Sequence, residues 1–258
     1  MLYNPRKHPE WLEPHSLQWY QQLGDSQKAY LYPWKSSVDG SDGETVFDNE
    51  VLKLAKGKKV LDVGCGHGEF AIMCSRFAEE VTGFDAIDSF LRSGLEKEKH
   101  NLKFVLGNTK EGLPFADNEF DIAYIRKGPT SAYKDLKRIV KNEGSIRGLH
   151  PGDFSGKELA DLFPGFFNPL KGTPILDKIK GVLQECSFTK TEIEIIETIE
   201  YLHEPMDVIR YGCFGQSLNL ISAVEKEGLI NIKRIFEKEA GRNGLSITHS
   251  RYMIRVEL

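Results

Sequence analysis

A glycine-rich run follows an acid at the end of a short apolar stretch. Gly64, Gly66 and Gly68 occupy alternate positions, and Asp62 precedes them in the stretch that begins at residue 59. Glycine lets the backbone approach a ligand closely and adopt positive φ values where a side chain would clash. At the carboxyl edge of a parallel sheet, such a loop forms a crevice for a nucleotide-like molecule. A generic strand-to-helix turn remains the alternative for this motif alone.

The glycine spacing separates two classes of ligand. The run forms GxGxG, whereas the dinucleotide fingerprint is GxGxxG and needs a glycine where Glu69 stands. A large acidic side chain at a helix start is a poor neighbour for a pyrophosphate. Asp62 instead suits a cationic ligand such as S-adenosylmethionine, which carries a sulfonium and an ammonium group and no phosphate. The pattern therefore favours that cofactor.

A second acid, Asp85, ends the next apolar stretch, roughly twenty residues beyond the loop. A carboxylate at that place can accept hydrogen bonds from the ribose hydroxyls of an adenosine cofactor. An Asp at a strand end is often only a turn or helix cap, as expected of Asp88. The pairing of Asp85 with the glycine loop favours the ligand role.

The elements that position these residues alternate along the chain. Short apolar runs, typical of buried strands, are separated by segments with helical spacing, and this order predicts βαβ units in a parallel, doubly wound sheet. The expected strands are 59–63, 81–84, 102–106, 121–125 and 144–149, and the expected helices are 69–78, 87–97 and 132–140. Alternation over 246–256 predicts a last strand.

Residues 1–45 are predicted to form an aromatic-rich N-terminal extension or lid, and residues 46–258 the main domain. Tyr20 and Trp34, with Tyr32 between them, are candidate substrate-binding residues. A hydrophobic strap over the sheet or a dimer contact is an equally good interpretation of this segment. A helical substrate cover is expected near residues 200–225.

Four motifs occur in order along the chain: VLDVGCGHGEF, VTGFD, VLGNTKEGLPFADNEFDIAY and KNEGSI. Together they resemble the class I S-adenosylmethionine-dependent methyltransferases, and they look closest to the group that includes ubiquinone and menaquinone biosynthesis methyltransferases. The resemblance covers about residues 59–149. It implies an α/β, Rossmann-like, mostly parallel seven-stranded sheet with an antiparallel last strand, and it implies S-adenosylhomocysteine as the product.

The same resemblance assigns roles around the cofactor. The acid and glycines of the loop would surround the methionine part, Asp85 would hold the ribose, and Asn108 would contact the adenine amine. Members of the family commonly have Asp at this last position, and the Asn carbonyl can accept the same bond. The implied cofactor-binding residues are Asp62, Gly64, Cys65, Gly66, Gly68, Asp85, Ala86, Asn108 and Thr109.

Signals for the methyl acceptor are weaker. The segment 124–129 (YIRKGP) lacks the (N/D)PP(Y/F) pattern of enzymes that methylate planar nitrogens, and its Arg126 is a candidate contact for an acidic or phosphorylated substrate. A solvent-facing cation is the alternative. His150, after the fifth expected strand, is a weak candidate for a catalytic base. Positioning and desolvation can supply much of the rate of methyl transfer, so a base need not exist.

Composition restricts the partners. The chain has 258 residues and a formal net charge of −4, which disfavours a protein whose main task is to grip nucleic acid. Its four cysteines are scattered, so no metal site is expected. No apolar stretch approaches the length of a membrane span, and a cytoplasmic location is expected.

The sequence therefore predicts a methyltransferase that transfers a methyl group by direct displacement to a small-molecule acceptor. A methyltransferase acting on an rRNA or tRNA base is the alternative within the enzyme class. Outside it stand an NAD-dependent oxidoreductase, which the GxGxG spacing disfavours, and a non-catalytic nucleotide-binding module. The oligomeric state and the acceptor atom are left open.

Overall fold

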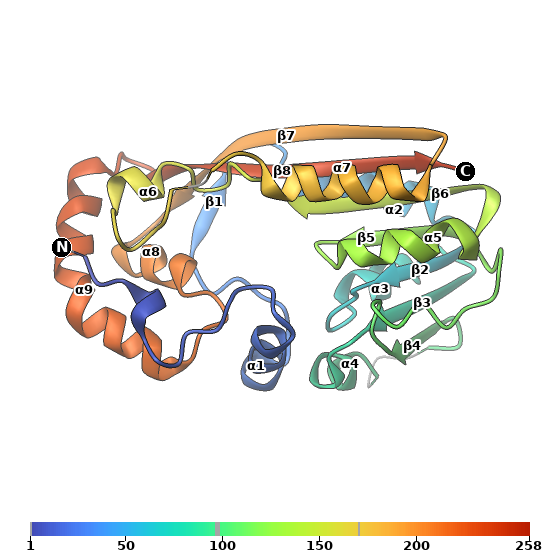
Figure 1. Ribbon diagram of the computed structural model, residues 1–258, viewed down its shortest axis with the longest axis horizontal. Helices are drawn as coiled ribbons and strands as arrows, with labels where there is room; N and C mark the ends of the chain where they lie inside the picture. The colour runs from blue at the N-terminus through green and yellow to red at the C-terminus, as the bar shows by residue number, and fades with distance from the viewer. Residues whose placement is uncertain (1, 96–98, 170) are drawn as a thin grey trace. The chain divides into compact units, whose positions relative to one another are not determined.

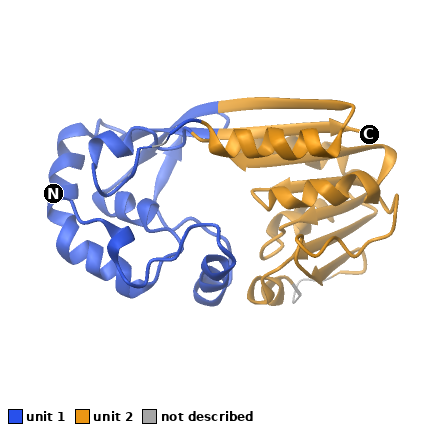
Figure 2. Cartoon of the chain, in the orientation of Figure 1, with its two compact units in different colours: residues 1–42, 154–172, 197–250 blue, residues 43–153, 173–196, 251–258 orange. Residues whose placement is uncertain are grey.

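The computed structural model describes residues 2–95, 99–169 and 171–258, which form two compact units (Figures 1 and 2). Unit 1 consists of the segments Met1–Asp42, Phe154–Gly172 and Glu197–Ser250, and unit 2 holds the rest of the chain. The division after residue 42 lies close to the one expected after residue 45. The chain beyond it, however, does not form one compact unit, because two of its segments belong to unit 1.

Within the described ranges, eight strands form one sheet in the order β1-β7-β8-β6-β5-β2-β3-β4. Strands β2 to β6 pair in parallel, whereas β8 is antiparallel to β6 and β1 is antiparallel to β7. The expected doubly wound, mostly parallel sheet with an antiparallel last strand is confirmed, with β1 as an additional edge strand. The strands are β1 Ser36–Val38, β2 Lys59–Val63, β3 Glu80–Asp85, β4 Leu102–Leu106, β5 Phe120–Arg126, β6 Val140–Pro151, β7 Lys190–Leu202 and β8 Leu245–Glu257.

Helices cover both faces of the sheet in unit 2 (Figure 1). One apolar cluster joins the sheet to α5 and α7, and a second joins it to α2 and α3. The expected helix over 87–97 is observed as α4, and its residues 96 and 97 lie outside the described residues. The helices of unit 2 are α2 Gly43–Leu54, α3 Glu69–Cys74, α4 Asp88–Leu95, the 3₁₀ helix η2 Thr130–Ala132, α5 Tyr133–Ile139 and α7 Pro174–Cys186.

Alternation along the central strands decides which side chains face which helices. Leu61 and Val63 of β2 belong to the cluster beneath α5 and α7, whereas Val60 belongs to the cluster beneath α2 and α3. Because successive side chains in a strand point to opposite faces, Asp62 faces the second cluster, where Tyr124 of β5 also lies. The sheet thus buries an acid and a phenol in the layer between its central strands and α2 and α3.

Ion pairs tie α2 to the sheet. Asp48 binds Arg126 of β5 through two bonds of 2.8 and 3.0 Å. Two residues further along the helix, Glu50 accepts from Arg147 of β6 at 2.6 Å and from Arg255 of β8 at 2.9 Å. Paired charges of this kind, half withdrawn from solvent, fix the position of the helix over the sheet more than they stabilise the fold.

Unit 1 has a helical core of its own. Buried side chains of α8 and α9 pack with those of α6 and with the first residues of β8. Ser217 caps α9 by accepting from the backbone N–H of Leu220, and Glu204 with Asp207 forms a capping box at the start of α8. The helices are α1 Leu17–Gln27, α6 Leu159–Leu162, α8 Pro205–Gly212, α9 Leu218–Glu239 and the 3₁₀ helix η1 Pro5–Lys7.

The N-terminal segment is an integral part of unit 1. Trp19 of α1 is 1 % exposed, and its Nε1 donates to the carbonyl of Phe214 at 2.9 Å. The indole ring packs against Gly215, which has φ +71° and where the Cβ of an alanine would clash with the indole. Gly215 is therefore required by the packing of Trp19. The first 42 residues are bound to the end of α8 and do not form a separate extension.

Removal of the Asp153 side chain should destabilise unit 2. This carboxylate is 6 % exposed, and it accepts from the N–H groups of Ile175 and Leu176 at the start of α7 and from the Tyr252 hydroxyl at 2.8 Å. Asp153→Ala leaves these donors unpaired, so we expect urea denaturation to show a loss of about 2–4 kcal/mol in the free energy of unfolding. Exposed Asp161 is the control, and Asp161→Ala should change it by less than about 0.5 kcal/mol. Equal effects of the two variants would contradict this role.

Candidate functional site

The glycine loop lies at the point where the strand order reverses. β2 and β5 are neighbours at the centre of the sheet, and the chain leaves them in opposite directions, which opens a crevice at their carboxyl ends. The loop follows β2 directly, and the N–H groups of Gly64 and Cys65 both donate to the carbonyl of Phe84 in β3, at 2.7 and 3.2 Å. These two hydrogen bonds fix the start of the loop to the end of β3.

Two of the glycines are required by their surroundings. Gly64 has φ +76°, and a Cβ there would lie 2.8 Å from the ring of Pro129 and 3.0 Å from the Cα atom of Gly128. Gly68 has φ +75°, and its Cβ would lie 2.5 Å from the ring of Phe104. At these two positions the loop packs so closely against its neighbours that only glycine fits.

Asp85 lies beside this loop, as the spacing predicted. One carboxylate oxygen accepts from the N–H of Gly66 at 2.8 Å and the other from the N–H of Ile87 at 2.9 Å. Burial raises the pKa of the Asp85 carboxyl above its usual value, and the two N–H donors counteract this. Each oxygen retains a lone pair, so the side chain can still accept from a ligand hydroxyl.

The loop after β4 joins the same edge. The N–H of Gly107 donates to the backbone carbonyl of Asp85 at 2.9 Å, which places Asn108 and Thr109 next in the chain. The side-chain Oδ1 of Asn108 accepts from the N–H of Lys110 at 3.0 Å, and the Thr109 hydroxyl lies 2.7 Å from that of Ser131. The structure therefore brings the predicted cofactor residues of three strands together, and their role with a ligand stays a prediction.

Asp62 is the most unusual member of this group. Its side chain is 2 % exposed, and its Oδ1 has no hydrogen-bond partner among the described residues. Burial raises the pKa of the carboxyl to about 7, and this rise is opposed by the Tyr124 hydroxyl and by Arg126. A buried acid with an open acceptor is costly, and such groups concentrate at functional sites.

Tyr124 is a residue that the sequence analysis missed. It is opposite Asp62 in the register of β2 and β5, it is fully buried, and its hydroxyl also has no partner of normal hydrogen-bond geometry among the described residues. The available signal was a hydroxyl-bearing side chain within the otherwise apolar stretch 122–125. In a parallel pair of strands, this residue can be the register partner of Asp62.

Arg126 and His150 are both engaged within the protein. Arg126 binds Asp48, and its guanidinium lies over the ring of Phe70 at 5.4 Å, which leaves it poorly placed to receive an acidic acceptor. His150 is 2 % exposed, its Nε2 lies 3.0 Å from the Tyr133 hydroxyl, and burial lowers its pKa to about 4. A buried imidazole with so low a pKa is a weak base, so the geometry argues against His150 in that role.

Tyr20 and Trp34 gather in unit 1, in an aromatic cluster that also contains Trp19, Tyr30, Tyr32, Tyr211 and Phe214. Tyr32 stacks on Trp34 with ring centroids 4.5 Å apart, and Phe214 is an edge-on neighbour of both. Tyr20 and Tyr30 continue the cluster toward Trp19. The N-terminal aromatics thus meet the predicted cover segment near 200–225. Tyr32, 36 % exposed, keeps part of its ring at the surface.

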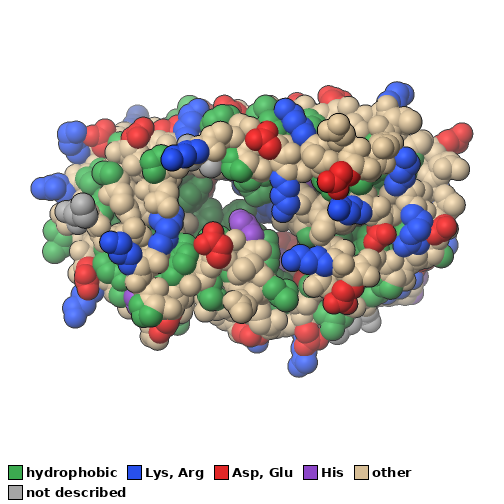
Figure 3. All heavy atoms as spheres, viewed as in Figure 1, with side chains coloured by type: hydrophobic (Ala, Val, Ile, Leu, Met, Phe, Trp, Pro, Cys, Tyr) green, Lys and Arg blue, Asp and Glu red, His purple; other side chains and the backbone are tan. Residues whose placement is uncertain are grey.

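The surface adds little that would suggest other partners. On the face shown in Figure 3, Lys and Arg side chains are interspersed with Asp and Glu. Among residues 2–95, 99–169 and 171–258, no group of His, Cys, Asp and Glu could hold a metal ion, and no helix combines the length and apolarity needed to cross a membrane.

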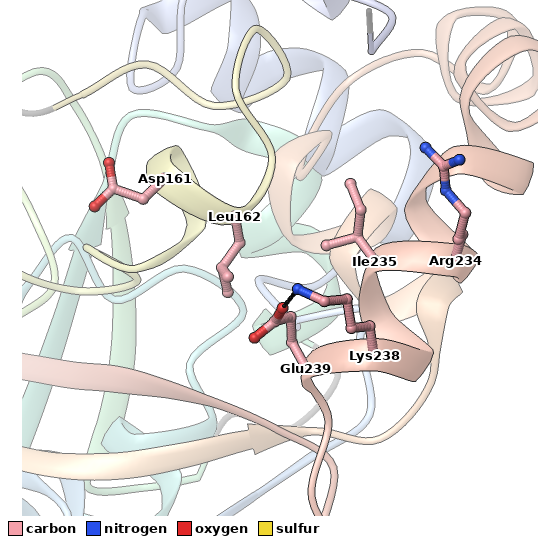
Figure 4. Close-up of a pocket in the computed structure, with 6 residues that line it drawn as sticks. All are labelled: Asp161, Leu162, Arg234, Ile235, Lys238 and Glu239. Atoms are coloured by element: carbon pink, nitrogen blue, oxygen red, sulfur yellow. Dashed lines mark hydrogen bonds and ion pairs between the residues drawn. The ribbon is translucent and has the colours of Figure 1, made fainter.

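A pocket of about 420 Å³ between α6 and α9 has an ion pair, Lys238 with Glu239, in its wall (Figure 4).

Known proteins share this architecture. Residues 60–144 match a family model described as a methyltransferase domain. A demethylmenaquinone methyltransferase of Staphylococcus aureus is 38 % identical over 129 residues, which covers 45 % of this chain and 53 % of that protein. The chain thus spans about half the length of the curated relatives it matches.

Two solved structures share the fold at low sequence identity. A functionally unknown protein from Deinococcus radiodurans covers 93 % of this chain and 100 % of its own, with a TM-score of 0.67 and 18 % identity. A phosphoethanolamine N-methyltransferase of Haemonchus contortus, in complex with phosphomonomethylethanolamine and S-adenosylhomocysteine, has a TM-score of 0.50 at 17 % identity and covers 84 % of this chain and 53 % of its own.

The fold of this chain is that of the class I S-adenosylmethionine-dependent methyltransferases. Residues 60–144, the segment that matches the methyltransferase domain model, carry the glycine loop, Asp85 and Asn108.

Asp62 should make the fold less stable as the pH rises. Because its folded pKa is raised from 3.8 to about 7, the folded chain holds a proton that the unfolded chain has lost, and stability falls between about pH 4 and pH 7. Asp62→Asn removes this cost. We expect its free energy of unfolding at pH 8 to exceed that of the unchanged protein by about 2–4 kcal/mol, with little difference at pH 4.

Asp121 provides the control for this measurement. Burial raises the pKa of its carboxyl, but Lys141 and the N–H of Lys59 lower it further, so the net direction is down. Asp121→Asn should therefore be neutral or destabilising at pH 8. A stability difference for Asp62→Asn that is the same at pH 4 and pH 8 would contradict the assignment.

Proposed function

We propose that the chain is an S-adenosylmethionine-dependent methyltransferase acting on a small-molecule acceptor, with S-adenosylhomocysteine as product. The observation that carries this proposal is the buried Asp62 with its open Oδ1, next to a backbone-lined loop and one strand from Asp85. A carboxylate of this kind suits a ligand ammonium group, and Asp85 has acceptors left for ribose hydroxyls. The donor and acceptor set fits this cofactor.

Each part of the site has a distinct task in this proposal. Asp62, Gly64, Cys65 and Gly66 hold the methionine part, Gly68 completes the loop, and Asp85 binds the ribose. Ala86, which is exposed at the end of β3, flanks the adenine. Asn108 contacts the exocyclic amine through its side-chain carbonyl, beside the backbone of Thr109.

The bound cofactor supplies an electrophilic methyl carbon. The chain's own residues need only orient the acceptor in line with it and exclude water, because correct placement alone lowers the barrier substantially. The burial of His150 and the engagement of Arg126 are consistent with a reaction that depends on positioning and not on a general base.

The relatives support the donor more than the acceptor. The match to the demethylmenaquinone methyltransferase is confined to about half of each chain, so its acceptor does not transfer by similarity alone. The structure with bound S-adenosylhomocysteine supports the cofactor by fold. The mixed surface charge gives no reason to prefer an RNA base, and Glu69 in the first turn of α3 disfavours a dinucleotide.

For the acceptor we propose the aromatic cluster of unit 1 as a binding surface. Tyr32 and Trp34 present stacked rings, Trp34 is held in place by a 2.9 Å bond from its Nε1 to buried Glu200, and Phe214 supports both from the side. Preorganised rings with a partly exposed edge bind planar or apolar molecules at small entropic cost.

Location in the cytoplasm stays a prediction.

The first test concerns Asp85. Asp85→Ala should weaken S-adenosylhomocysteine binding by about 1.5–3 kcal/mol in titration calorimetry, because hydrogen bonds to a charged group are lost. The matched control is Asp88→Ala, which removes a half-exposed acid in the first turn of α4 whose partner is Arg92. This control should leave the affinity unchanged.

Two outcomes would contradict the donor assignment. One is an affinity for S-adenosylhomocysteine that Asp85→Ala leaves unaltered. The other is tight binding of NADH by a protein that does not bind S-adenosylmethionine or S-adenosylhomocysteine, which would instead support the oxidoreductase alternative.

The second test concerns the aromatic cluster. In a screen that follows S-adenosylhomocysteine release over a metabolite panel, including demethylmenaquinone and phosphomonomethylethanolamine, Tyr32→Ala should raise the KM for the acceptor about 5- to 10-fold. This is the size of one lost ring stack, and the Kd for S-adenosylhomocysteine should not change. Leu31→Ala is the control, since Leu31 is 55 % exposed and belongs to no ring contact of the cluster. Equal KM values for both variants would exclude Tyr32 from acceptor binding.

A further inference from the structure

Asp62 and Tyr124 form an unusual pair at the centre of unit 2. They are opposite each other on adjacent strands, 2 % and 0 % exposed, and both retain a polar atom without a hydrogen-bond partner among the described residues. Buried polar atoms are almost always satisfied in folded proteins, so two unsatisfied ones side by side need an explanation. Asp62 is next to the glycine loop, which begins two residues later, and Tyr124 is its neighbour on β5.

The tyrosine ring is held rigidly. Phe70 of α3 makes an edge contact with centroids 5.3 Å apart, and Phe47 of α2 makes another at 6.3 Å. Burial, together with the charge of Asp62, keeps the pKa of the Tyr124 hydroxyl well above its usual value, so the group is always a proton donor. The phenol can therefore stabilise the ionised form of Asp62. It keeps its own proton and does not become the charged partner.

We propose that Tyr124 is a positioning residue for cofactor binding: its hydroxyl keeps the Asp62 carboxylate ionised and directed at the glycine loop, so that the affinity for the cationic cofactor depends on Tyr124. The proposal rests on the function proposed above. It assigns Tyr124 no contact with the acceptor or the reacting carbon.

The charges around Asp62 explain why a neutral hydroxyl matters. Arg126 favours the ionised carboxylate from β5, but Asp48 of α2 and Asp85 of β3 oppose it. The nearby thiols of Cys65 in the loop and Cys74 in α3 are uncharged, because burial raises the pKa of both. Arg126 is itself paired with Asp48. With its strongest cation compensated, Asp62 depends on the adjacent Tyr124 hydroxyl to stay charged near neutral pH.

The first experiment uses the ligand-free protein. The titration of Asp62 is followed by NMR of ¹³C-labelled aspartate carboxyls, with Asp62→Asn to identify the signal. Tyr124→Phe keeps the ring and removes the hydroxyl, and it should raise the midpoint by about one pH unit. Tyr133→Phe, the same change at another fully buried tyrosine whose hydroxyl faces His150, should not move it. An unmoved midpoint in Tyr124→Phe overturns the proposal.

The second experiment measures S-adenosylhomocysteine binding between pH 6 and pH 9. At pH 7 Tyr124→Phe should weaken binding about 5- to 10-fold, and the difference from the unchanged protein should vanish at pH 9, where Asp62 is ionised in both. A loss that is the same at every pH would show only a structural role and would also overturn the proposal.

A double variant separates the remaining cases. If Tyr124 acts through Asp62, Tyr124→Phe should have no further effect on affinity in the Asp62→Asn background, which removes the cost of the buried charge and so favours folding. An additional loss there contradicts the proposal. If the unchanged protein binds no S-adenosylhomocysteine at any pH, the proposed function fails, while the ligand-free titration still decides the link between Tyr124 and Asp62.

Discussion

The constraint on which the site depends is the burial of one carboxylate at the centre of the sheet. Asp62 is part of a strand whose neighbours are apolar on both faces, so withdrawing its charge from water raises its pKa and costs stability. Nothing in the packing requires an acid there, since an apolar side chain would suit the layer beneath α2 and α3 better. The surrounding structure compensates the charge only in part, through Tyr124 and a guanidinium already bound to Asp48. A buried acid with an open acceptor fits the cationic cofactor that we propose for this site.

The rest of unit 2 can be understood as support for that carboxylate. The glycine loop follows Asp62 directly and packs closely against Pro129 and Phe104. No Cβ would fit against them at Gly64 or Gly68. Asp85 holds the loop from the next strand through the N–H of Gly66. Phe47 of α2 and Phe70 of α3 pack against the ring of Tyr124, which is fully buried. Rigid backbone, a buried acid and a buried hydroxyl together would give the proposed cofactor a preorganised site.

Much of this was accessible from the sequence, because the signals are local. A run such as KVLDV is buried on both faces and predicts a central parallel strand, and the spacing from Asp62 to the glycines and to Asp85 follows the chain continuously. What the sequence could not supply depends on contacts between distant residues. Tyr124 matters only because β5 is the neighbour of β2, and the burial of His150 follows from α5. The division into two units was missed because unit 1 is assembled from three separated segments, whose association depends on contacts such as Trp19 with Gly215.

The same distinction explains why the methyl donor is easier to predict than the acceptor. In the proposed site the donor is held by backbone geometry and two acids within one stretch of chain, so its signature is a motif. The proposed acceptor surface is made of rings from residues 19–34 and from the end of α8, where any large aromatic side chain could serve and no spacing is prescribed. Because methyl transfer needs placement and not a particular base, the acceptor imposes no invariant residue on the site. Specificity in such an enzyme is then a property of shape and ring contact, which can change without any change in the glycine loop.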